Sequence, residues 1–423
     1  MHTWLRNLAI VQPLRLRSFR VIWIGESVSM LGDQFYLVAL PWLTLELTGS
    51  TLALGLVLMA AAIPRAALML LGGAVSDRVE PRMVMMASSA ARAVLVGILA
   101  ALVWADAVQL WQLYLLGALF GAADAFFQPA ALALIPRMVE RDGLEASNAL
   151  VTGSMAITGM VGPALAGIAV GLAGAAIGFG IDALTFAFAV LTVLSIGRPR
   201  AVADSSAGER SGGTLRAIRD GLAYAYRDGQ IRVVLLAVLV INFAVVGPFF
   251  VGLPALVASF NGGPADYGLV LSAWGAAALG GAVAAGTLGA RWRMATLIPA
   301  TALAMAIALL LMGLAPNALF AALASTPLGA AVGMLQVAGM AWLQRRSDPE
   351  MQGRLMSLAM LAVMGLTPAS YAVAGVAAQA GPSFLFVSAA ATMLVLALLT
   401  VQAAALRGPC DADAVMQAPD PCV

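Results

Sequence analysis

Long apolar stretches, separated by short polar or glycine- and proline-containing turns, run through almost the whole chain. Each is long enough for a membrane-crossing α-helix, which needs about 20 residues. The pattern predicts six such helices in the first half, at residues 20–46, 52–75, 82–104, 111–135, 148–171 and 176–197. It predicts six more in the second half, at residues 231–257, 267–289, 294–314, 318–343, 355–379 and 383–406. We therefore expect an all-α membrane protein with twelve transmembrane helices.

The helices fall into two six-helix bundles that repeat one another. The expected domains are a polar N-terminal segment, the first bundle, a charged linker, the second bundle and a polar tail, at residues 1–19, 20–197, 198–230, 231–406 and 407–423. The spacing from Gly73 to Arg78 after the second helix recurs from Gly286 to Arg291 after the eighth. We infer a duplicated six-helix unit, an arrangement in which the two halves typically rock about a central site.

The composition agrees with a lipid environment and excludes several chemistries. Apolar residues make up 62% of the chain and charged residues only 10%, whereas a globular protein has about 25% charged residues. His2 is the only histidine and Cys410 and Cys422 are the only cysteines, so histidine-based catalysis and histidine- or cysteine-ligated metal sites are not expected. No nucleotide-binding phosphate loop is present. We expect neither an enzyme nor a bound cofactor or metal.

The arginines predict the topology. With a cytoplasmic N-terminus, every arginine except Arg65 and Arg92 falls in a terminus or in a cytoplasmic connection, as the positive-inside rule requires. Both termini are therefore expected in the cytoplasm, with the chain in the inner (plasma) membrane. The apolar stretch from Val21 to Leu47 is too long for a signal-peptide core, so we interpret it as a retained first helix. Acidic residues interspersed in the linker argue against nucleic-acid binding.

Ionisable groups within the predicted spans are costly and suggest function. All of them lie in the first half: Glu26, Asp33, Arg65, Arg92, Asp124 and Asp182. From a rise of about 1.5 Å per residue, Asp33 and Asp124 lie about 20 Å from the cytoplasmic edge, with Arg65 near 15 Å. A carboxyl group that exchanges water for an arginine changes its proton affinity. We predict that Asp33, Asp124 and Arg65 couple proton movement to conformation.

Structural roles are the alternative for several of these residues. Arg65 and Asp124 are as well explained by simple charge balance. Glu26 and Arg92 are expected to pair or to extend toward the inner interface. Asp182 is expected to be a solvated cap near the outer interface.

Short motifs resemble the major facilitator superfamily. The motif Gly73-x-x-x-Asp77-Arg78-x-x-x-Arg82 follows the second predicted helix, although Glu80-Pro81 replaces the usual Gly-Arg. Further stretches are similar to the drug/proton antiporter branch that includes macrolide efflux proteins and the enterobactin exporter: Leu31-Gly-Asp33, Ala39-Leu-Pro41, Leu47-Thr-Gly-Ser50, Ile63-Pro64-Arg65, Asn148-Ala-Leu150 and Gly353-Arg-Leu-Met-Ser357. The resemblance implies two six-helix bundles and alternating access.

The resemblance also implies roles for two sets of residues. Gly73, Asp77, Arg78 and Arg82 would form a cytoplasmic latch that holds one conformation, with a merely topogenic role as the alternative. The fifth helix carries a small-residue motif for close helix packing, made of Gly159, Gly162, Pro163 and Gly167. Thr158 stands where the branch usually has glycine.

Together these features predict a secondary active transporter that exports small amphipathic molecules in exchange for protons. Its expected partners are the small-molecule substrate, protons and the lipid bilayer, and we expect a monomer. Two alternatives remain open at this point: an importer or facilitator of a specific metabolite on the same fold, and a membrane receptor that does not transport.

Overall fold

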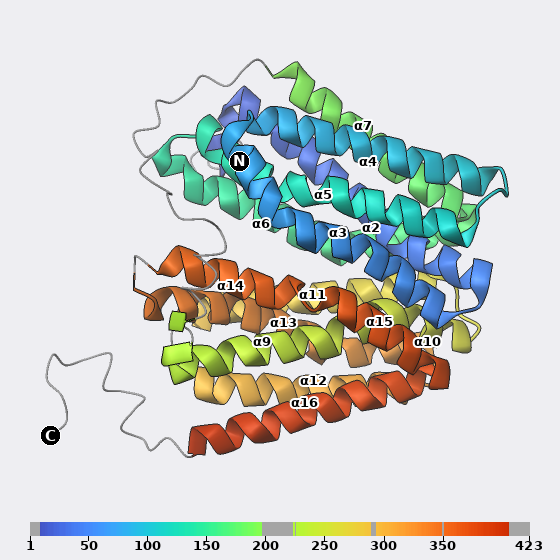
Figure 1. Cartoon of the computed structure of the whole chain (residues 1–423), viewed down its shortest axis with the longest axis vertical. Helices are drawn as coiled ribbons and strands as arrows, with labels where there is room; N and C mark the ends of the chain where they lie inside the picture. The colour runs from blue at the N-terminus through green and yellow to red at the C-terminus, as the bar shows by residue number, and fades with distance from the viewer. Residues whose placement is uncertain (1–8, 197–222, 225, 289–292, 349–350, 406–423) are drawn as a thin grey trace, which may run out of the picture.

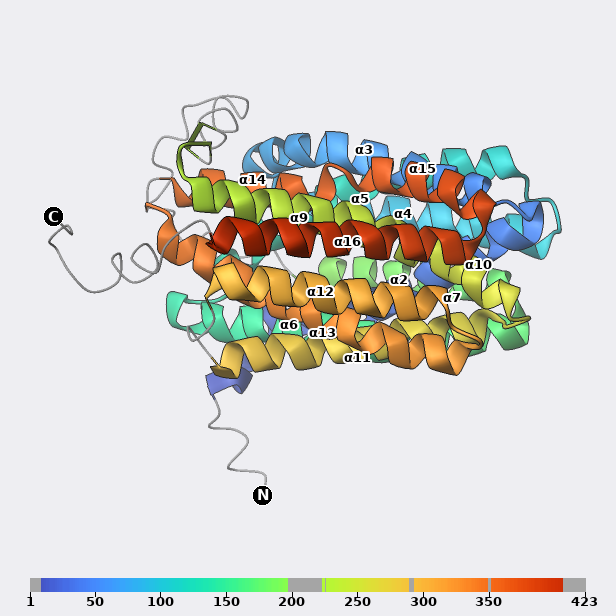
Figure 2. The ribbon, with the colours of Figure 1, turned by 90° about the horizontal axis from the view of Figure 1, so that it is seen from below.

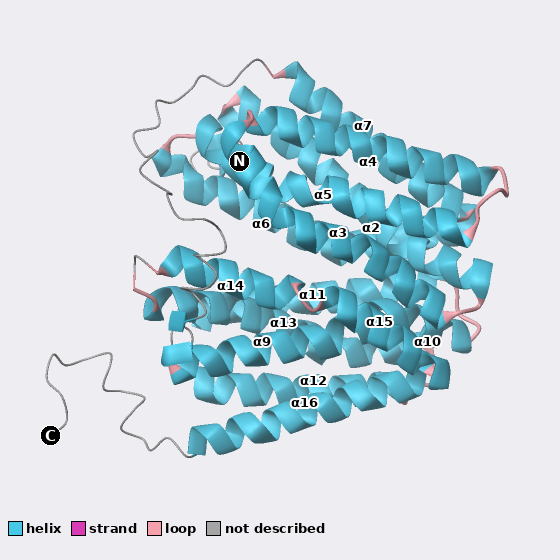
Figure 3. Ribbon diagram, viewed as in Figure 1, coloured by secondary structure: helices cyan, strands magenta, loops and turns pink. Residues whose placement is uncertain are grey.

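The computed structural model describes residues 9–196, 223–224, 226–288, 293–348 and 351–405, and these are almost entirely helical, with no strand among them (Figure 3). The start of the N-terminal segment, nearly all of the linker and the whole predicted tail lie outside the described residues.

The first half contains six long helices in sequence order. They are α2 (Arg17–Thr48), α3 (Thr51–Arg78), α4 (Pro81–Trp104), α5 (Leu110–Met138), α6 (Leu144–Ala173) and α7 (Ala175–Ser195). Short 3-10 turns, η1 (Ala9–Arg15) and η2 (Arg141–Gly143), precede α2 and α6. The connection from α2 to α3 needs only two residues because Gly49 takes a left-handed conformation with φ of 61°. Ser50 then caps α3 by accepting a hydrogen bond from the amide of Ala53.

The second half has the same number of spans, but two of them are interrupted. Its elements are α9 (Gly229–Gly247), the π-helical turn η3 (Pro248–Gly252), α10 (Leu253–Ser259), α11 (Pro264–Leu288), α12 (Met294–Gly313), α13 (Ala318–Arg346), α14 (Gln352–Met364), α15 (Thr367–Ala377), η5 (Ala378–Ala380) and α16 (Pro382–Ala405). The helix expected at 231–257 widens at Pro248, and the helix expected at 355–379 breaks before Pro368. Proline cannot donate a main-chain hydrogen bond, which favours an interruption at both positions, although Pro64 and Pro163 lie inside continuous helices of the first half.

Eleven helical stretches among the described residues are long and apolar enough to cross a membrane. The twelfth predicted span is α2, which has 32 residues. Glu26 and Asp33 lie within α2 and lower its apolar character. The protein is therefore an all-α membrane protein of the predicted architecture.

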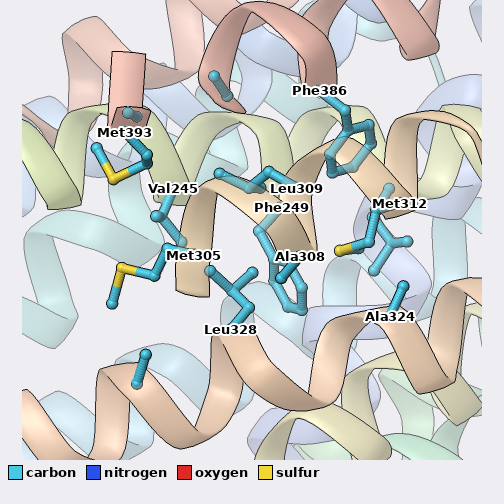
Figure 4. Packing of buried hydrophobic residues seen from close by; sticks show 14 of the residues in the cluster. Val245, Phe249, Met305, Ala308, Leu309, Met312, Ala324, Leu328, Phe386 and Met393 are labelled. Atoms are coloured by element: carbon cyan, nitrogen blue, oxygen red, sulfur yellow. The ribbon is translucent and has the colours of Figure 1, made fainter. Parts of the chain in front are cut away.

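The two halves form separate blocks of roughly parallel and antiparallel helices. In Figure 1, α2–α7 lie above α9–α16, and in Figure 2, which is seen from below, α9, α12 and α16 of the second half lie in front. The largest apolar core among the described residues lies mostly in the second half, where Phe249, Met305, Leu309 and Leu328 pack together (Figure 4), and it extends to α2 and α6 of the first half. The ionisable residues inside the spans lie in the first half, so the two halves differ in chemistry although they share a fold.

The halves contact each other mainly through α6 against α11 and through α3 against α15. The Thr51 hydroxyl donates to the Gly375 carbonyl at 3.1 Å, and the Ala164 amide donates to the Ser272 hydroxyl at 2.9 Å. Both contacts lie toward the end of the molecule opposite the arginine-rich connections, which we call the distal end. Toward the arginine-rich end the ribbons of the two halves diverge (Figure 1).

Asp228 anchors the arginine-rich end of α9. Its Oδ1 accepts from the amides of Gln230 and Ile231 at 2.8 and 3.2 Å, and its Oδ2 accepts from Arg346 Nε of α13 at 2.8 Å. Partial burial disfavours the charged form of the Asp228 carboxyl group. The hydrogen bonds favour that form more strongly and hold the pKa of Asp228 below its usual 3.8.

We expect Asp228→Asn to lower the free energy of unfolding at neutral pH by about 1 kcal/mol, since asparagine keeps the cap but loses the ion pair. The folded-state pKa is depressed, so this contribution is complete above the unfolded value and disappears as the pH falls through the folded value. Denaturant titrations in detergent at neutral and acidic pH measure it. Asp106→Asn, at an exposed turn, is the matched control. A difference that persists in acid would contradict the ion-pair account.

Candidate functional site

Three of the ionisable side chains form a connected ion triad across three helices. Asp124 on α5 lies between Arg65 on α3 and Arg92 on α4. Arg65 Nε is 3.0 Å from Asp124 Oδ2, and Arg92 Nη1 is 3.2 Å from Asp124 Oδ1. One carboxylate therefore joins two cations, each through a different oxygen.

Arg92 is the buried end of the ion triad. Its side chain is 3% exposed, and its guanidinium lies between the rings of Phe127 and Phe186, at 4.2 and 4.4 Å from their centroids. Arg92 Nη2 also donates to the Ser89 hydroxyl at 3.3 Å. Arg92 pairs with Asp124, and no hydrogen bond or ion pair joins it to Glu26 among the described residues. It does not extend to the inner interface, because aromatic contacts and the carboxylate hold it inside the bundle.

Arg65 is the accessible end of the ion triad, with a side chain 45% exposed, whereas Asp124 is 13% exposed. The charge of Arg65 acts on Asp33 of α2 and also on Tyr371 of α15 in the second half. Arg65 therefore faces the region between the halves. Because Arg65 is exposed and Asp124 is largely buried, the ion pair between them can break while Arg92 stays in place.

Asp33 belongs to the same electrostatic neighbourhood but not to the ion triad. No hydrogen bond or ion pair joins it to another described side chain, yet Arg92, Asp124 and Arg65 all lie within electrostatic range. The structure thus brings Asp124 and Arg65 into contact and places Asp33 separately on α2. The charge of Arg92 reaches Glu26, Asp33 and Asp182 in addition to Asp124. Arg92 is the shared cation of all four intramembrane acids, a role that the sequence did not reveal.

A small apolar cavity lies between the halves close to this group. Its volume is about 50 Å³, and its lining residues are Tyr36, Leu37, Leu40, Pro41, Leu58, Phe250 and Tyr371. Tyr36 stacks on Phe120 with centroids 4.5 Å apart, and Phe250 meets Tyr371 edge to face at 6.5 Å. Ligand pockets measure about 300–1,000 Å³, so this cavity does not accommodate a drug-sized molecule in the present arrangement. Sequence reasoning missed Tyr36, although it follows Asp33 by three residues and so shares its helix face.

The predicted latch motif is only partly described. Gly73, Asp77 and Arg78 lie in the last turns of α3 and not in a loop, and the side chains of Asp77 and Arg78 lie outside the described residues. Arg82 on α4 donates to the main-chain carbonyls of Val193 and Leu194 at 3.0 and 3.2 Å. An arginine at the C-terminus of α7 is favourable for the helix dipole. This contact joins helices of the first half and does not by itself connect the two halves.

The small-residue motif of α6 lies at the contact between the halves. A side chain on Gly167 would overlap the carbonyl of Pro264 on α11, and one on Gly268 of α11 would overlap the carbonyl of Pro163. A side chain on Gly275 of α11 would likewise overlap the carbonyl of Gly159, whereas one on Gly159 itself would meet no atom within 4 Å. Gly162 lies against Gln34 of α2 and not against the second half. Main chain therefore touches main chain along α6 and α11, which only glycine allows.

The expectation for Asp182 is wrong. Asp182 is not a solvated cap, because its exposed fraction is 0% and neither carboxyl oxygen has a hydrogen-bond partner among the described residues. It lies in the second turn of α7, which packs against α2 and α4. Counting residues from the helix end gave its depth but not this lateral packing, and no local sequence signal marks it.

Comparisons with known proteins agree with this geometry. The sequence pattern of the transmembrane secretion effector family matches residues 9–423. Macrolide efflux protein A of Streptococcus pyogenes is 23% identical over 348 residues, which cover 81% of this chain and 84% of that protein. The multidrug efflux pump Tap of Mycolicibacterium fortuitum is 29% identical over 190 residues, 43% of this chain and 44% of the pump. The solved structure of the nucleoside transporter NupG superposes with a TM-score of 0.75 at 14% identity, covering 91% of this chain and 99% of NupG, and shows a shared fold. The chain belongs to the transmembrane secretion effector family of major facilitator transporters.

Proposed function

We propose that the protein exports small amphipathic molecules, of the macrolide or multidrug type, in exchange for protons. The observation that carries the proposal is the group of intramembrane acids around Arg92 in the first half, next to the region between the halves. The similarity to macrolide efflux protein A and to the multidrug efflux pump Tap supports the direction and the class of substrate.

Charge balance supports proton coupling. Glu26, Asp33, Asp124 and Asp182 share only Arg65 and Arg92 as intramembrane cations among the described residues. An unpaired charge inside a bilayer costs several kcal/mol, so the group is neutral only when two of the acids hold protons. If the access of water to these acids differs between the two states of the transporter, their proton affinity differs too. The acids then take up and release protons as the transporter changes state.

In the proposed cycle, Asp33 exchanges a proton for a cationic or hydrogen-bonding substrate. The present arrangement, with the halves in contact toward the distal end, corresponds to the state that loads from the arginine-rich side. Substrate displaces the proton of Asp33, the contacts of α6 with α11 open, and the substrate leaves at the distal end. Arg65 competes with the substrate for the carboxylates of Asp124 and Asp33, and after the substrate leaves it restores the starting arrangement of charges.

We further propose that the arginine-rich end is cytoplasmic, with both termini there, and that the protein acts as a monomer in the plasma membrane. The positive-inside rule supports this orientation. Gly73, Asp77, Arg78 and Arg82 would stabilise one conformation from that side, with Arg82 fixing the end of α7.

Accumulation of a radiolabelled macrolide in cells tests this function. Cells that express the protein are expected to retain less macrolide than cells without it, and an uncoupler that collapses the proton gradient removes the difference. Asp33→Asn is expected to lose most of the efflux because the asparagine amide cannot carry a proton. Asp106→Asn, the same chemical change at an exposed turn, is expected to retain it. Greater accumulation in expressing cells would indicate import, and uncoupler-resistant efflux would reject proton exchange.

A further inference from the structure

Asp182 is a buried acid for which the proposed cycle has no role so far. Its carboxyl group lies between α7, α2 and α4, fully shielded, with both oxygens unpartnered among the described residues. Thr185 of the same helix lies beside the carboxyl group, but its hydroxyl donates to the main-chain carbonyl of Asp182 at 2.8 Å.

The charges around Asp182 do not compensate an ionised carboxylate. Asp33 and the neutral Tyr36 face it from α2, and Arg92 faces it from α4. Arg92 is already bonded to Asp124, and Asp33 adds a charge of the same sign once it has lost its proton. A buried carboxylate without hydrogen bonds or its own cation is strongly unfavourable. The protonated, neutral acid is the form that this environment accommodates.

Gly32 of α2 lies directly against the carboxyl group of Asp182. A Cβ atom on Gly32 would lie 2.8 Å from Asp182 Oδ1 and would overlap the hydroxyl of Thr185. Gly25, two turns earlier, faces Thr192 of α7 in the same way. Because Gly32 directly precedes Asp33, movement of α2 against α7 both uncovers Asp182 and displaces Asp33. The two acids therefore respond to the same motion.

We infer that Asp182 is a second proton-carrying residue of this transporter, which holds a proton in the present arrangement and passes it to Asp33 when α2 moves against α7. The O–H bond of Asp182 breaks and an O–H bond forms on the Asp33 carboxylate, so charge and atoms balance. After the transfer, Asp182 is a carboxylate, and Arg92 of α4 is the cation that faces it. This inference rests on the proposed proton exchange. It adds a second buried acid whose proton is transferred to Asp33.

Infrared difference spectroscopy of the purified full chain in lipid nanodiscs tests the protonation. The wild type at neutral pH is expected to show carbonyl absorption of protonated carboxyl groups without hydrogen bonds. Asp182→Asn is expected to lose one component of it, and this component is expected to remain in Asp33→Asn. The asparagine side chain is the neutral isostere of the protonated acid, so the fold is retained. Thr192→Val changes the same helix contact two turns away, where the hydroxyl donates to the Ala189 carbonyl, and is expected to keep this component. A wild type without such absorption, or an Asp182→Asn spectrum that keeps every component of the wild type, would overturn the inference.

Proton release on addition of a macrolide, measured with a pH dye in weakly buffered solution, tests the coupling. Asp182→Asn is expected to release fewer protons per bound macrolide than the wild type, and Asp33→Asn none, because the route passes through Asp33. Equal release by Asp182→Asn and the wild type would overturn the role of Asp182 as a carrier. A wild type that binds macrolide but releases no proton would reject the proposed exchange, while the infrared absorption still decides whether Asp182 holds a proton.

Discussion

Asp124→Asn is expected to lower the free energy of unfolding by about 3 kcal/mol, the largest stability loss of any single change in the ion triad. The substitution leaves Arg92 charged, 3% exposed and without its carboxylate. Removal of one partner from a buried pair costs about 3–5 kcal/mol, because the remaining charge is not compensated. Arg65→Gln is expected to cost less than about 1 kcal/mol, since the Arg65 side chain is 45% exposed and water replaces the lost contact. Denaturant titration in detergent measures both.

A double variant separates the buried charge from other effects at this position. Asp124→Asn combined with Arg92→Met removes the uncompensated cation and keeps an apolar side chain between Phe127 and Phe186. It is expected to recover part of the stability lost by Asp124→Asn alone. Asp106→Asn controls for the chemical change at an exposed site. If Asp124→Asn were as stable as the wild type, Arg92 would not depend on Asp124 and the ion triad would not organise the first half.

Gly268→Ala is expected to separate the two halves at the distal end. The new Cβ would overlap the carbonyl oxygen of Pro163 and lie 3.1 Å from the Cα of Gly167. Both neighbours are main-chain atoms of α6, so no side chain can move aside to make room. The present arrangement therefore becomes strained, and the population is expected to shift toward the opposite state. Spin labels at Leu172 and Leu314, exposed residues of different halves near the distal end, report the distance between the halves.

Gly280→Ala is the matched control for this change. It lies on the same helix, α11, and a Cβ there meets no atom within 4 Å. Both variants gain the same helix propensity, about 1 kcal/mol, so only the contact with α6 differs. The distance between the labels is expected to lengthen in Gly268→Ala and to stay unchanged in Gly280→Ala. An unchanged distance in both would mean that the contact between α6 and α11 does not control the arrangement of the halves.

The sequence predicted the helices better than the contacts between them. Apolar stretch length and arginine placement depend on single segments, so the twelve spans were predictable with errors of a few residues. The interruptions at Pro248 and before Pro368 were missed because an apolar pattern does not report local main-chain geometry.

The candidate site shows the same limit. Helical rise correctly suggested that Arg65 and Asp124 lie at similar depths, and the structure places them in contact. Depth alone could not show that Arg92 lies between two aromatic rings or that Asp182 lies against Gly32. Those features depend on how α4 and α7 pack sideways on their neighbours, which requires coordinates. The functional roles of Asp33, Asp124 and Arg65 stay predictions.

The central claim is that acids of the first half change protonation when the transporter changes state. Everted membrane vesicles with an acidic lumen and a lumenal pH dye test it most directly. Addition of macrolide to wild-type vesicles is predicted to drain protons from the lumen while macrolide accumulates there, and Asp33→Asn vesicles are predicted to do neither. Macrolide accumulation with no change in lumenal pH in wild-type vesicles would contradict the account.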